Sequence, residues 1–219
     1  MKKHLNLYNL TLVLFVQYVV VTIVMILLYD AGNRYAPVSP HFVLNQNYLS
    51  DLGRSVSFSG VANPSYVFYS LTLGLAGIGI FLFFQQLQST MTSKAKYLIS
   101  LLALVSAIGY IGIALYPVNI DLVTHVLFGR LAYFSFFFTS VISHILLNKD
   151  RFKTANKLFW ILNILLFLYL LLMLFGPNSS QGVWALQLKT IAQKVVVYSQ
   201  IILCMGIFIN ISKNRLKKT

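Results

Sequence analysis

The sequence predicts an all-α integral membrane protein, built as a bundle of six transmembrane helices. Of its 219 residues, 58% are hydrophobic and only 10% are charged, and the mean hydropathy is +0.77. Soluble domains carry about a quarter charged residues, so this composition is too apolar for a surface in water. The apolar residues also come in blocks of about 20, the length of helix that crosses a hydrocarbon core roughly 30 Å thick. We therefore expect a single transmembrane domain over residues 1–219.

Six apolar blocks define the predicted helices. They cover residues 7–29, 65–87, 97–116, 122–147, 158–175 and 184–211. The first block follows Met-Lys-Lys, as the apolar part of a signal peptide would. It is too long for that role and no small-x-small cleavage site follows it, so we expect an uncleaved helix.

The connection over residues 30–64 is the one long loop, and loops of this length often carry function. Residues 41–52 hold enough apolar side chains for a short interfacial or partly re-entrant segment. Asn63 followed by Pro64 is typical of a helix start, with Asn as the N-cap and Pro at the first helical position. The second predicted helix therefore begins directly after this pair.

The basic residues predict the orientation of the helices. One side of the predicted bundle holds twelve of them: Lys2, Lys3, Lys94, Lys96, Lys149, Arg151, Lys153, Lys157, Lys213, Arg215, Lys217 and Lys218. The other side holds only Arg34 and Arg54. Because cytoplasmic loops are enriched in Lys and Arg, we expect both termini inside and the long loop outside. A net charge of +13 would suggest nucleic-acid binding in a soluble protein. Here it is a topology signal, and no nucleic-acid partner is expected.

Cysteine and glycine usage limits the chemistry further. Cys204 is the only cysteine and lies in an apolar run, which excludes a disulfide and a cysteine-based metal site. No metal or other cofactor is predicted. Small residues in the second and third helices favour close helix packing over clearance for a ligand. They are Gly74, Ala76, Gly77, Gly79, Ser106, Ala107, Gly109 and Gly112.

Three basic residues fall inside predicted spans, where an ionisable group costs roughly 3 kcal/mol or more. Arg130 lies in the fourth helix, nearly opposite the face of Asp121, and needs a partner on another segment or a lipid phosphate. Lys189 can extend to the outer interface. Lys194 lies deeper, and either pairs with a carboxylate, Asp51 or Asp121, or binds an anion. Of these two readings the ion pair is favoured.

Asp121 and His125 lie four residues apart at the outer end of the fourth helix, on one helical face. One reading is an imidazole oriented by a carboxylate, as in general base catalysis or around a metal ion. The other reading, which we favour, has Asp121 capping the helix while His125 bonds to a neighbouring helix. The chain has no His-Glu-x-x-His and no Gly-x-Ser-x-Gly pattern, so no residue is assigned as catalytic. The candidates are His125, Asp51 and Asp121.

The order of short motifs resembles a known family. Residues 48–53 read Tyr-Leu-Ser-Asp-Leu-Gly in the long loop, residues 114–117 read Ala-Leu-Tyr-Pro at the end of the third helix, and His125 opens the fourth. This resembles the prokaryotic membrane family catalogued as domain of unknown function 998, over roughly residues 8–212. It is more distantly similar to the eukaryotic Frag/DRAM/Sfk membrane proteins.

The resemblance implies a six-helix protein of the prokaryotic plasma membrane, with a site on its outer face. Carried over onto this chain, the site residues are Ser50, Asp51, Gly53 and His125. The acidic residues that the family has after the proline are matched only by Asp121. The distant relatives are linked to lipids, so membrane lipids are the expected partners. In a Ser-Asp-x-Gly turn, the carboxylate is expected to accept backbone N–H bonds and Gly53 to take a positive φ.

The leading hypothesis for function is a protein that binds a lipid headgroup in a polar pocket of the outer leaflet. Ser50, Asp51 and His125 would contact the headgroup, and Lys189 or Arg130 would meet its phosphate.

Two other classes stay open, and so does a homo-oligomer. An intramembrane enzyme acting on lipids would use His125 as base, with Asp51 or Asp121 orienting it or binding a metal. A small-solute or proton-coupled transporter would use Lys194 and Asp51 as a switchable pair. No inverted repeat is visible, which disfavours the transporter.

Overall fold

The computed structural model describes residues 2–29, 32–148 and 150–216, and six long helices account for most of them. The elements are α1 Lys2–Leu28, the 3-10 helix η1 Leu49–Gly53, α2 Ser65–Gln88, α3 Lys96–Leu115, α4 Leu122–Leu146, α5 Lys153–Phe175 and α6 Val183–Leu216. Each of α1 to α6 is long and apolar enough to cross a membrane. The predicted fold class, an all-α bundle of six transmembrane helices, is confirmed.

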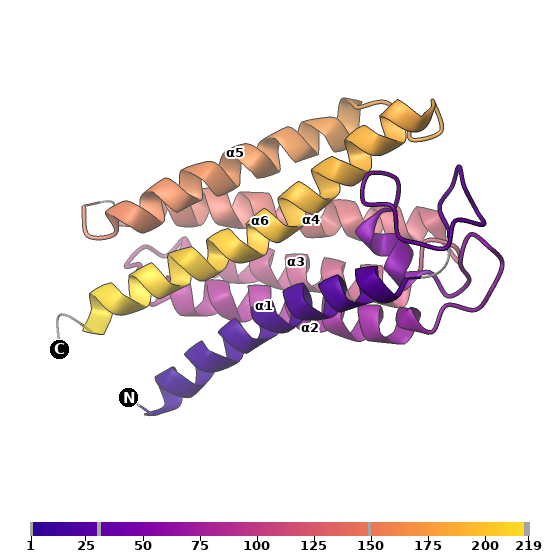
Figure 1. Ribbon diagram of the computed structural model, residues 1–219. Coiled ribbons are helices and arrows are strands. Elements are labelled where there is room, and N and C mark those ends of the chain that lie inside the picture. The colour runs from indigo at the N-terminus through magenta and orange to yellow at the C-terminus, as the bar shows by residue number, and fades with distance from the viewer. Residues whose placement is uncertain (1, 30–31, 149, 217–219) are drawn as a thin grey trace.

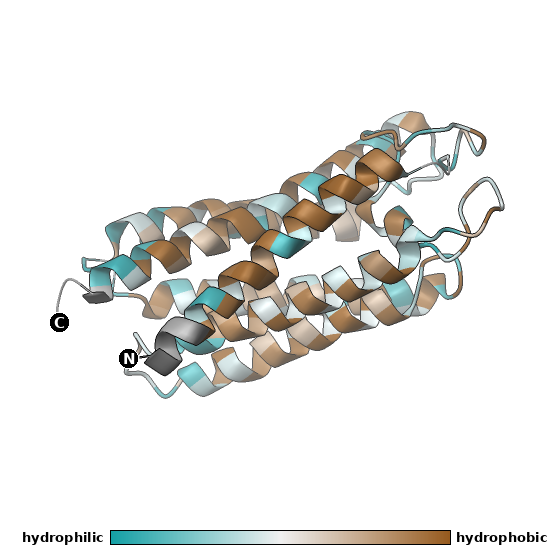
Figure 2. Cartoon of the chain, turned by 60° about the horizontal axis from the view of Figure 1, so that its bottom comes forward, coloured by the Kyte–Doolittle hydropathy of each residue, from teal (hydrophilic) through white to brown (hydrophobic). Residues whose placement is uncertain are grey.

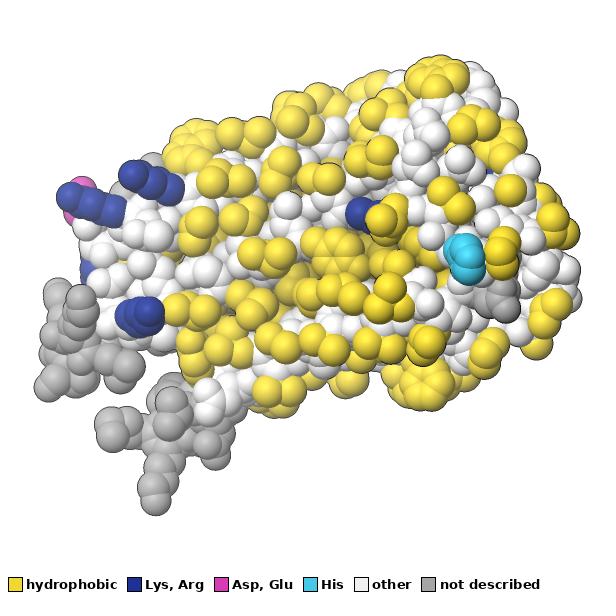
Figure 3. Space-filling view, viewed as in Figure 1, with side chains coloured by type: hydrophobic (Ala, Val, Ile, Leu, Met, Phe, Trp, Pro, Cys, Tyr) yellow, Lys and Arg dark blue, Asp and Glu magenta, His cyan; other side chains and the backbone are white. Residues whose placement is uncertain are grey.

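The helices run alternately up and down, so the start of α1 and the end of α6 lie at the same end of the bundle (Figure 1). We call this the terminus end. The opposite end, which carries the α1–α2, α3–α4 and α5–α6 connections, is the loop end. Hydrophobic residues cover much of the length of the helices (Figure 2), and hydrophobic side chains cover the middle of the face in Figure 3. The protein is a multi-pass membrane protein.

The helix ends extend beyond the predicted apolar blocks. α5 begins at Lys153 instead of residue 158, and α6 runs to Leu216 instead of residue 211. Hydropathy finds only the part of a helix that suits hydrocarbon, whereas the helix itself continues into polar residues at the membrane surface.

Glycines let α2, α3 and α4 pack closely, as predicted. A Cβ added to Gly77 would lie 3.1 Å from the carbonyl oxygen of Ala107, and one added to Gly109 would lie 2.6 Å from the backbone nitrogen of Ala132. Gly74 differs, because a Cβ there would meet no atom within 4 Å. The small residues at these contacts therefore serve helix packing.

The α1–α2 connection folds back into the bundle through η1. Leu49 and Leu52 of this short helix are almost fully buried and pack on the core. The side chain of Asn63 holds the end of η1, donating to the carbonyl oxygens of Leu52 at 3.0 Å and Arg54 at 2.8 Å. Its oxygen accepts from the backbone N–H of Ser65 at 3.1 Å. The N-cap of α2 is Pro64, so the predicted cap at Asn63 is wrong by one position. Asn63 bonds to the first residue of α2 and also positions the segment around Asp51.

Polar side chains of α6 hold the same connection from the other side. The hydrogen bonds run from Thr190 Oγ1 to the Asn45 carbonyl at 2.8 Å, from the Leu49 N–H to Gln193 Oε1 at 2.8 Å, and from Lys194 Nζ to the Asn47 carbonyl. The side of α6 that carries Thr190, Gln193 and Lys194 thus binds the loop.

α4 and α5 meet mainly in the half of the bundle near the termini. There Ser140 donates to Asn163 at 2.6 Å, and the buried ring of His144 also bonds to Asn163. Of the aromatic pairs that join α4 to α5, the one nearest the loop end is Tyr133 with Tyr169, whose ring centroids are 5.0 Å apart. Beyond this pair a cavity separates the two helices.

Candidate functional site

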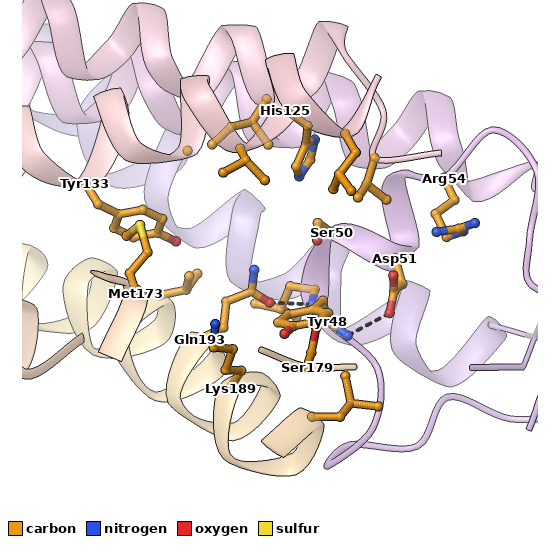
Figure 4. Close-up of a pocket in the computed structure, with 18 of the residues that line it drawn as sticks. Tyr48, Ser50, Asp51, Arg54, His125, Tyr133, Met173, Ser179, Lys189 and Gln193 are labelled. Carbon is orange, nitrogen blue, oxygen red and sulfur yellow. Dashed lines mark hydrogen bonds between the residues drawn. The ribbon is translucent and has the colours of Figure 1, made fainter. Parts of the chain in front are cut away.

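A cavity of about 430 Å³ occupies the loop end of the bundle. Figure 4 shows α4 on one side of it, α6 on the other, and the segment that carries Ser50 and Asp51 between them. The end of α5 and the α5–α6 connection complete the wall, through Met173 and Ser179. The cavity therefore lies where the loop, α4 and α6 converge.

Most of the predicted site residues line this one cavity. They are Ser50 and Asp51 from η1, His125 and Arg130 from α4, and Lys189 from α6. Asp121 and Lys194, which were also predicted, are not among its lining residues. The two acidic candidates therefore lie in different environments, and only Asp51 faces the cavity.

Asp51 is buried and serves as the cap of its own short helix. Its Oδ2 accepts the backbone N–H of Tyr48 at 2.7 Å and the side-chain N–H of Asn47 at 3.4 Å (Figure 4 shows the first of these). Burial penalises the ionised carboxylate and raises the pKa of Asp51 to about 6, although these bonds and the charge of Arg54 act in the other direction. A small change of pH near neutrality thus changes the charge of the cavity.

The expected backbone conformation of Gly53 was wrong. Among the described residues, positive φ angles occur only at Gly32, Gly60 and Gly182. η1 continues in a right-handed conformation through Gly53, so no special φ is needed there. Glycine is required for space instead, because a Cβ at this position would lie 2.5 Å from Cδ1 of the Tyr69 ring.

His125 and Asp121 follow the favoured structural reading. Asp121 Oδ1 accepts the backbone N–H of Thr124 at 2.9 Å and caps α4, and hydrogen bonds from Thr124 hold the pKa of Asp121 below its usual value. His125 Nδ1 lies 2.7 Å from the carbonyl oxygen of Tyr116, at the end of α3. Because a carbonyl only accepts, Nδ1 carries the proton, and Nε2 of the neutral ring is an acceptor. The imidazole is therefore oriented by a carbonyl, and the carboxylate-oriented reading is wrong.

The predicted ion pair of Lys194 is also wrong. Its Nζ donates to the backbone carbonyls of Asn47 and Thr190, and lies 5.3 Å from the centroid of the Phe42 ring. Asn47 stands between the two charges, since its carbonyl meets Lys194 while its side chain bonds to Asp51. Backbone dipoles thus satisfy the ammonium group without a carboxylate.

Arg34 and Arg54 also line the cavity, and they were not predicted as site residues. Arg34 Nη1 donates to Ser179 Oγ at 3.3 Å, and the guanidinium of Arg54 lies 4.0 Å from the Phe58 ring centroid. The sequence does hold a signal for them, because they are the only two basic residues on the side that the charge distribution leaves nearly free of Lys and Arg. With Arg130 and Lys189 they make four cations, against Asp51 as the one carboxylate of the lining.

Tyrosines form the deep end of the cavity. Tyr69, Tyr110 and Tyr133 are buried there, and the Tyr110 hydroxyl donates to Gln200 at 3.0 Å. The lining residues of α6 extend from Leu186 to Val197, about 16 Å along the helix axis at 1.5 Å per residue. The cavity lining on α6 is therefore about half as long as a hydrocarbon core roughly 30 Å thick.

Side chains that could hold a metal do not gather here. In the parts of the chain that the structure describes, no three His, Cys, Asp or Glu residues come together as a metal site. Cys204 is buried in the core, as expected.

Fold and site together define a multi-pass helical membrane protein with a cationic cavity at one end. Comparisons of the chain with family models, with curated proteins and with solved structures find no match. The similarity to domain of unknown function 998 therefore stays a prediction, and function has to be argued from the cavity itself.

Proposed function

We propose that this protein binds the phosphate-bearing headgroup of a membrane lipid in its loop-end cavity. The observation that carries the proposal is the charge of the lining, with Arg34, Arg54, Arg130 and Lys189 against the single carboxylate of Asp51. Guanidinium groups bind phosphate through paired, charge-assisted hydrogen bonds, and a Lys ammonium adds a compact charge. The Tyr133 hydroxyl at the deep end would supply a further hydrogen bond to a headgroup oxygen, whereas the Tyr110 hydroxyl already donates to Gln200.

The position of Arg130 favours an anionic ligand in particular. This residue is the ninth of α4, about 12 Å along the helix from Leu122. Its side chain is exposed to the cavity and makes no hydrogen bond or ion pair within the described residues. A guanidinium at such a depth costs roughly 3 kcal/mol when unpaired, and a phosphate would compensate for it.

The distribution of charge supports an outer-leaflet location. Basic residues at the terminus end include Lys94, Lys96, Arg151, Lys153 and Lys157, and Figure 3 shows most of the dark blue side chains of that face there. The predicted basic residues Lys149, Lys217 and Lys218, and the side chains of Lys2, Lys3 and Arg215, lie outside the described residues. By the positive-inside rule, we propose that the terminus end faces the cytoplasm and the cavity faces the outer surface. The family resemblance suggests that the membrane is a prokaryotic plasma membrane.

An enzyme that modifies the bound lipid is the second candidate. The bond from His125 Nδ1 to the Tyr116 carbonyl leaves Nε2 as a proton acceptor on a ring that lines the cavity, beside the buried hydroxyl-bearing Ser50. Conversion of a bound lipid by wild type, lost in His125→Gln, would favour this class. The transporter has less support, because its switchable Lys194–Asp51 pair is not formed.

Titration of phosphatidylglycerol against the detergent-solubilised protein tests the proposal. Arg130→Gln and Lys189→Gln each remove one charged hydrogen-bond donor worth about 1.5–3 kcal/mol, so each is expected to weaken binding by about 10–100-fold. Lys157→Gln is the matched control, since it removes an exposed charge at the opposite end. Equal affinity for all four proteins, or no binding to any, would contradict the proposal.

A further inference from the structure

The loop-end face of the cavity is closed by contacts between two connections. Ser179, in the α5–α6 connection, accepts from Arg34 Nη1 on its hydroxyl at 3.3 Å and from the Tyr35 hydroxyl on its carbonyl at 3.1 Å. Arg34, Tyr48 and Ser179 all line the cavity. The hydrogen bonds from Arg34 and Tyr35 to Ser179 therefore cover the cavity on its aqueous side.

The wall made by α4 is open in contrast. Leu122, Val126 and Gly129 lie on one face of this helix and all line the cavity. Leu122 is 55% exposed and Val126 is 39% exposed, which is far too much for the wall of an enclosed space. A Cβ added to Gly129 would meet no atom within 4 Å, whereas one added to Gly112 of α3 would lie 2.2 Å from the Phe128 ring. Among the described residues, this stripe of α4 is therefore only partly covered.

No hydrogen bond closes the gap between α4 and the α5–α6 pair near the loop end. Within the described residues, the hydrogen bonds that join α4 to α5 start at Ser140, and the Tyr133–Tyr169 ring contact marks the deep limit of the opening. On the loop side of these tyrosines the two walls are separated by the cavity. The opening therefore faces sideways, at a level where the surroundings of a transmembrane helix are lipid.

We propose that the ligand is a membrane phospholipid that enters this cavity sideways, between α4 and the α5–α6 pair, past Gly129. The proposal rests on the function proposed above and narrows it to a lipid that is bound with its chains attached. The phosphate reaches Arg130 and Lys189 within the cavity. The acyl chains leave the cavity sideways past Gly129, where a Cβ would meet no atom within 4 Å, and enter the surrounding lipid.

Substitutions at Gly129 test the entry route without touching a cation. Gly129→Leu places a branched side chain in the opening, and it is expected to weaken phosphatidylglycerol binding at least tenfold. Gly129→Ala adds a single methyl in open space, improves the helix propensity, and is expected to weaken binding less than Gly129→Leu does. Gly74→Leu is the matched control, since a Cβ at Gly74 of α2 also meets no atom within 4 Å and this glycine does not line the cavity. The thermal midpoints of all variants show that each one folds.

The outcomes separate the entry route from the proposed function. If Gly129→Leu binds phosphatidylglycerol as wild type does, sideways entry is wrong while the headgroup site stands. If wild type binds no phosphatidylglycerol, the proposed function fails and sideways entry fails with it. Glycerol phosphate is the probe for a water-soluble ligand. Displacement of the lipid by an equal concentration of glycerol phosphate would overturn the inference, because the chains would then contribute nothing.

Discussion

Replacing Asp51 by asparagine is expected to stabilise the protein at neutral pH. Only 4% of this residue is exposed, and burial raises its pKa from 3.8 to about 6. A tenfold change in proton affinity corresponds to about 1.4 kcal/mol, so the ionised carboxylate costs the fold about 3 kcal/mol. Asparagine carries no charge and keeps an oxygen that can accept the Tyr48 N–H. A penalty of this kind is typical of functional sites, where a group is held for its chemistry.

The pH dependence of this effect has a definite sign. A carboxyl group that holds its proton more tightly in the folded state stabilises the fold below its unfolded pKa and loses this contribution as the pH rises through its folded pKa. For Asp51 the loss falls between about pH 4 and pH 6. The advantage of Asp51→Asn over wild type is therefore close to zero at pH 4, grows across that window and stays at about 3 kcal/mol above it.

Thermal unfolding of the detergent-solubilised protein between pH 4 and pH 8 measures this difference. For a domain of about 200 residues, 3 kcal/mol corresponds to roughly 6–12 °C in Tm. Asp121→Asn is the matched control, because Asn caps a helix about as well as Asp and this carboxyl is not buried. A Tm of Asp51→Asn at pH 7 that equals or falls below that of wild type would refute the reasoning. The carboxylate would then have a compensating cation, such as the ion pair with Lys194 that the structure lacks.

Gly53→Ala is expected to lower the unfolding free energy by about 1–3 kcal/mol, because its Cβ would lie 2.5 Å from the Tyr69 ring; an unchanged Tm would mean that the ring moves aside freely. Asp121→Ala removes the cap on Thr124 and is expected to cost about 1 kcal/mol while leaving phosphatidylglycerol affinity intact. Loss of lipid binding in that variant would put Asp121 in the site after all. The lipid affinity of wild type is expected to rise about tenfold as the pH falls from 7 to 5, since Asp51 loses its charge in that range. The estimate takes the Asp51 carboxylate and the lipid phosphate as two charges roughly 10 Å apart, which repel by about 1.5 kcal/mol at an effective dielectric of 20. The comparison is with Asp51→Asn, whose profile is expected to be flatter; identical profiles would contradict the role of Asp51.

The six helices could be predicted because their signal is local. A run of about 20 apolar residues has few alternatives to a membrane-spanning helix, and the blocks in this sequence are well separated. The helix ends were harder to predict, since α5 starts with Lys153 and Thr154 before its apolar block begins. The helix cap at Asp121 could also be predicted, because its partner Thr124 is only three positions away.

The site could be predicted only in part, because its geometry depends on the path of the long loop. The cost of charge in the membrane was enough to single out Arg130 and Lys189. How η1 returns into the bundle is decided by contacts between distant residues, which no local pattern reveals. That path puts Asn47 between Lys194 and Asp51 and so prevents the expected ion pair.

The same long-range path brings Arg34 and Arg54 into the cavity lining. The reason for glycine at position 53 cannot be read from the sequence around it either. Glycine is needed there for the Tyr69 ring, which comes from another helix.

The central claim is that a phosphate-bearing lipid occupies the loop-end cavity. Native mass spectrometry of the protein purified from its own membrane, together with phosphorus quantification, tests it most directly. The account predicts one phospholipid retained per chain in wild type and in Lys157→Gln, and strongly reduced occupancy in Arg130→Gln and Lys189→Gln. A wild-type protein that carries no phosphorus, or the same phospholipid occupancy in all four proteins, would contradict it.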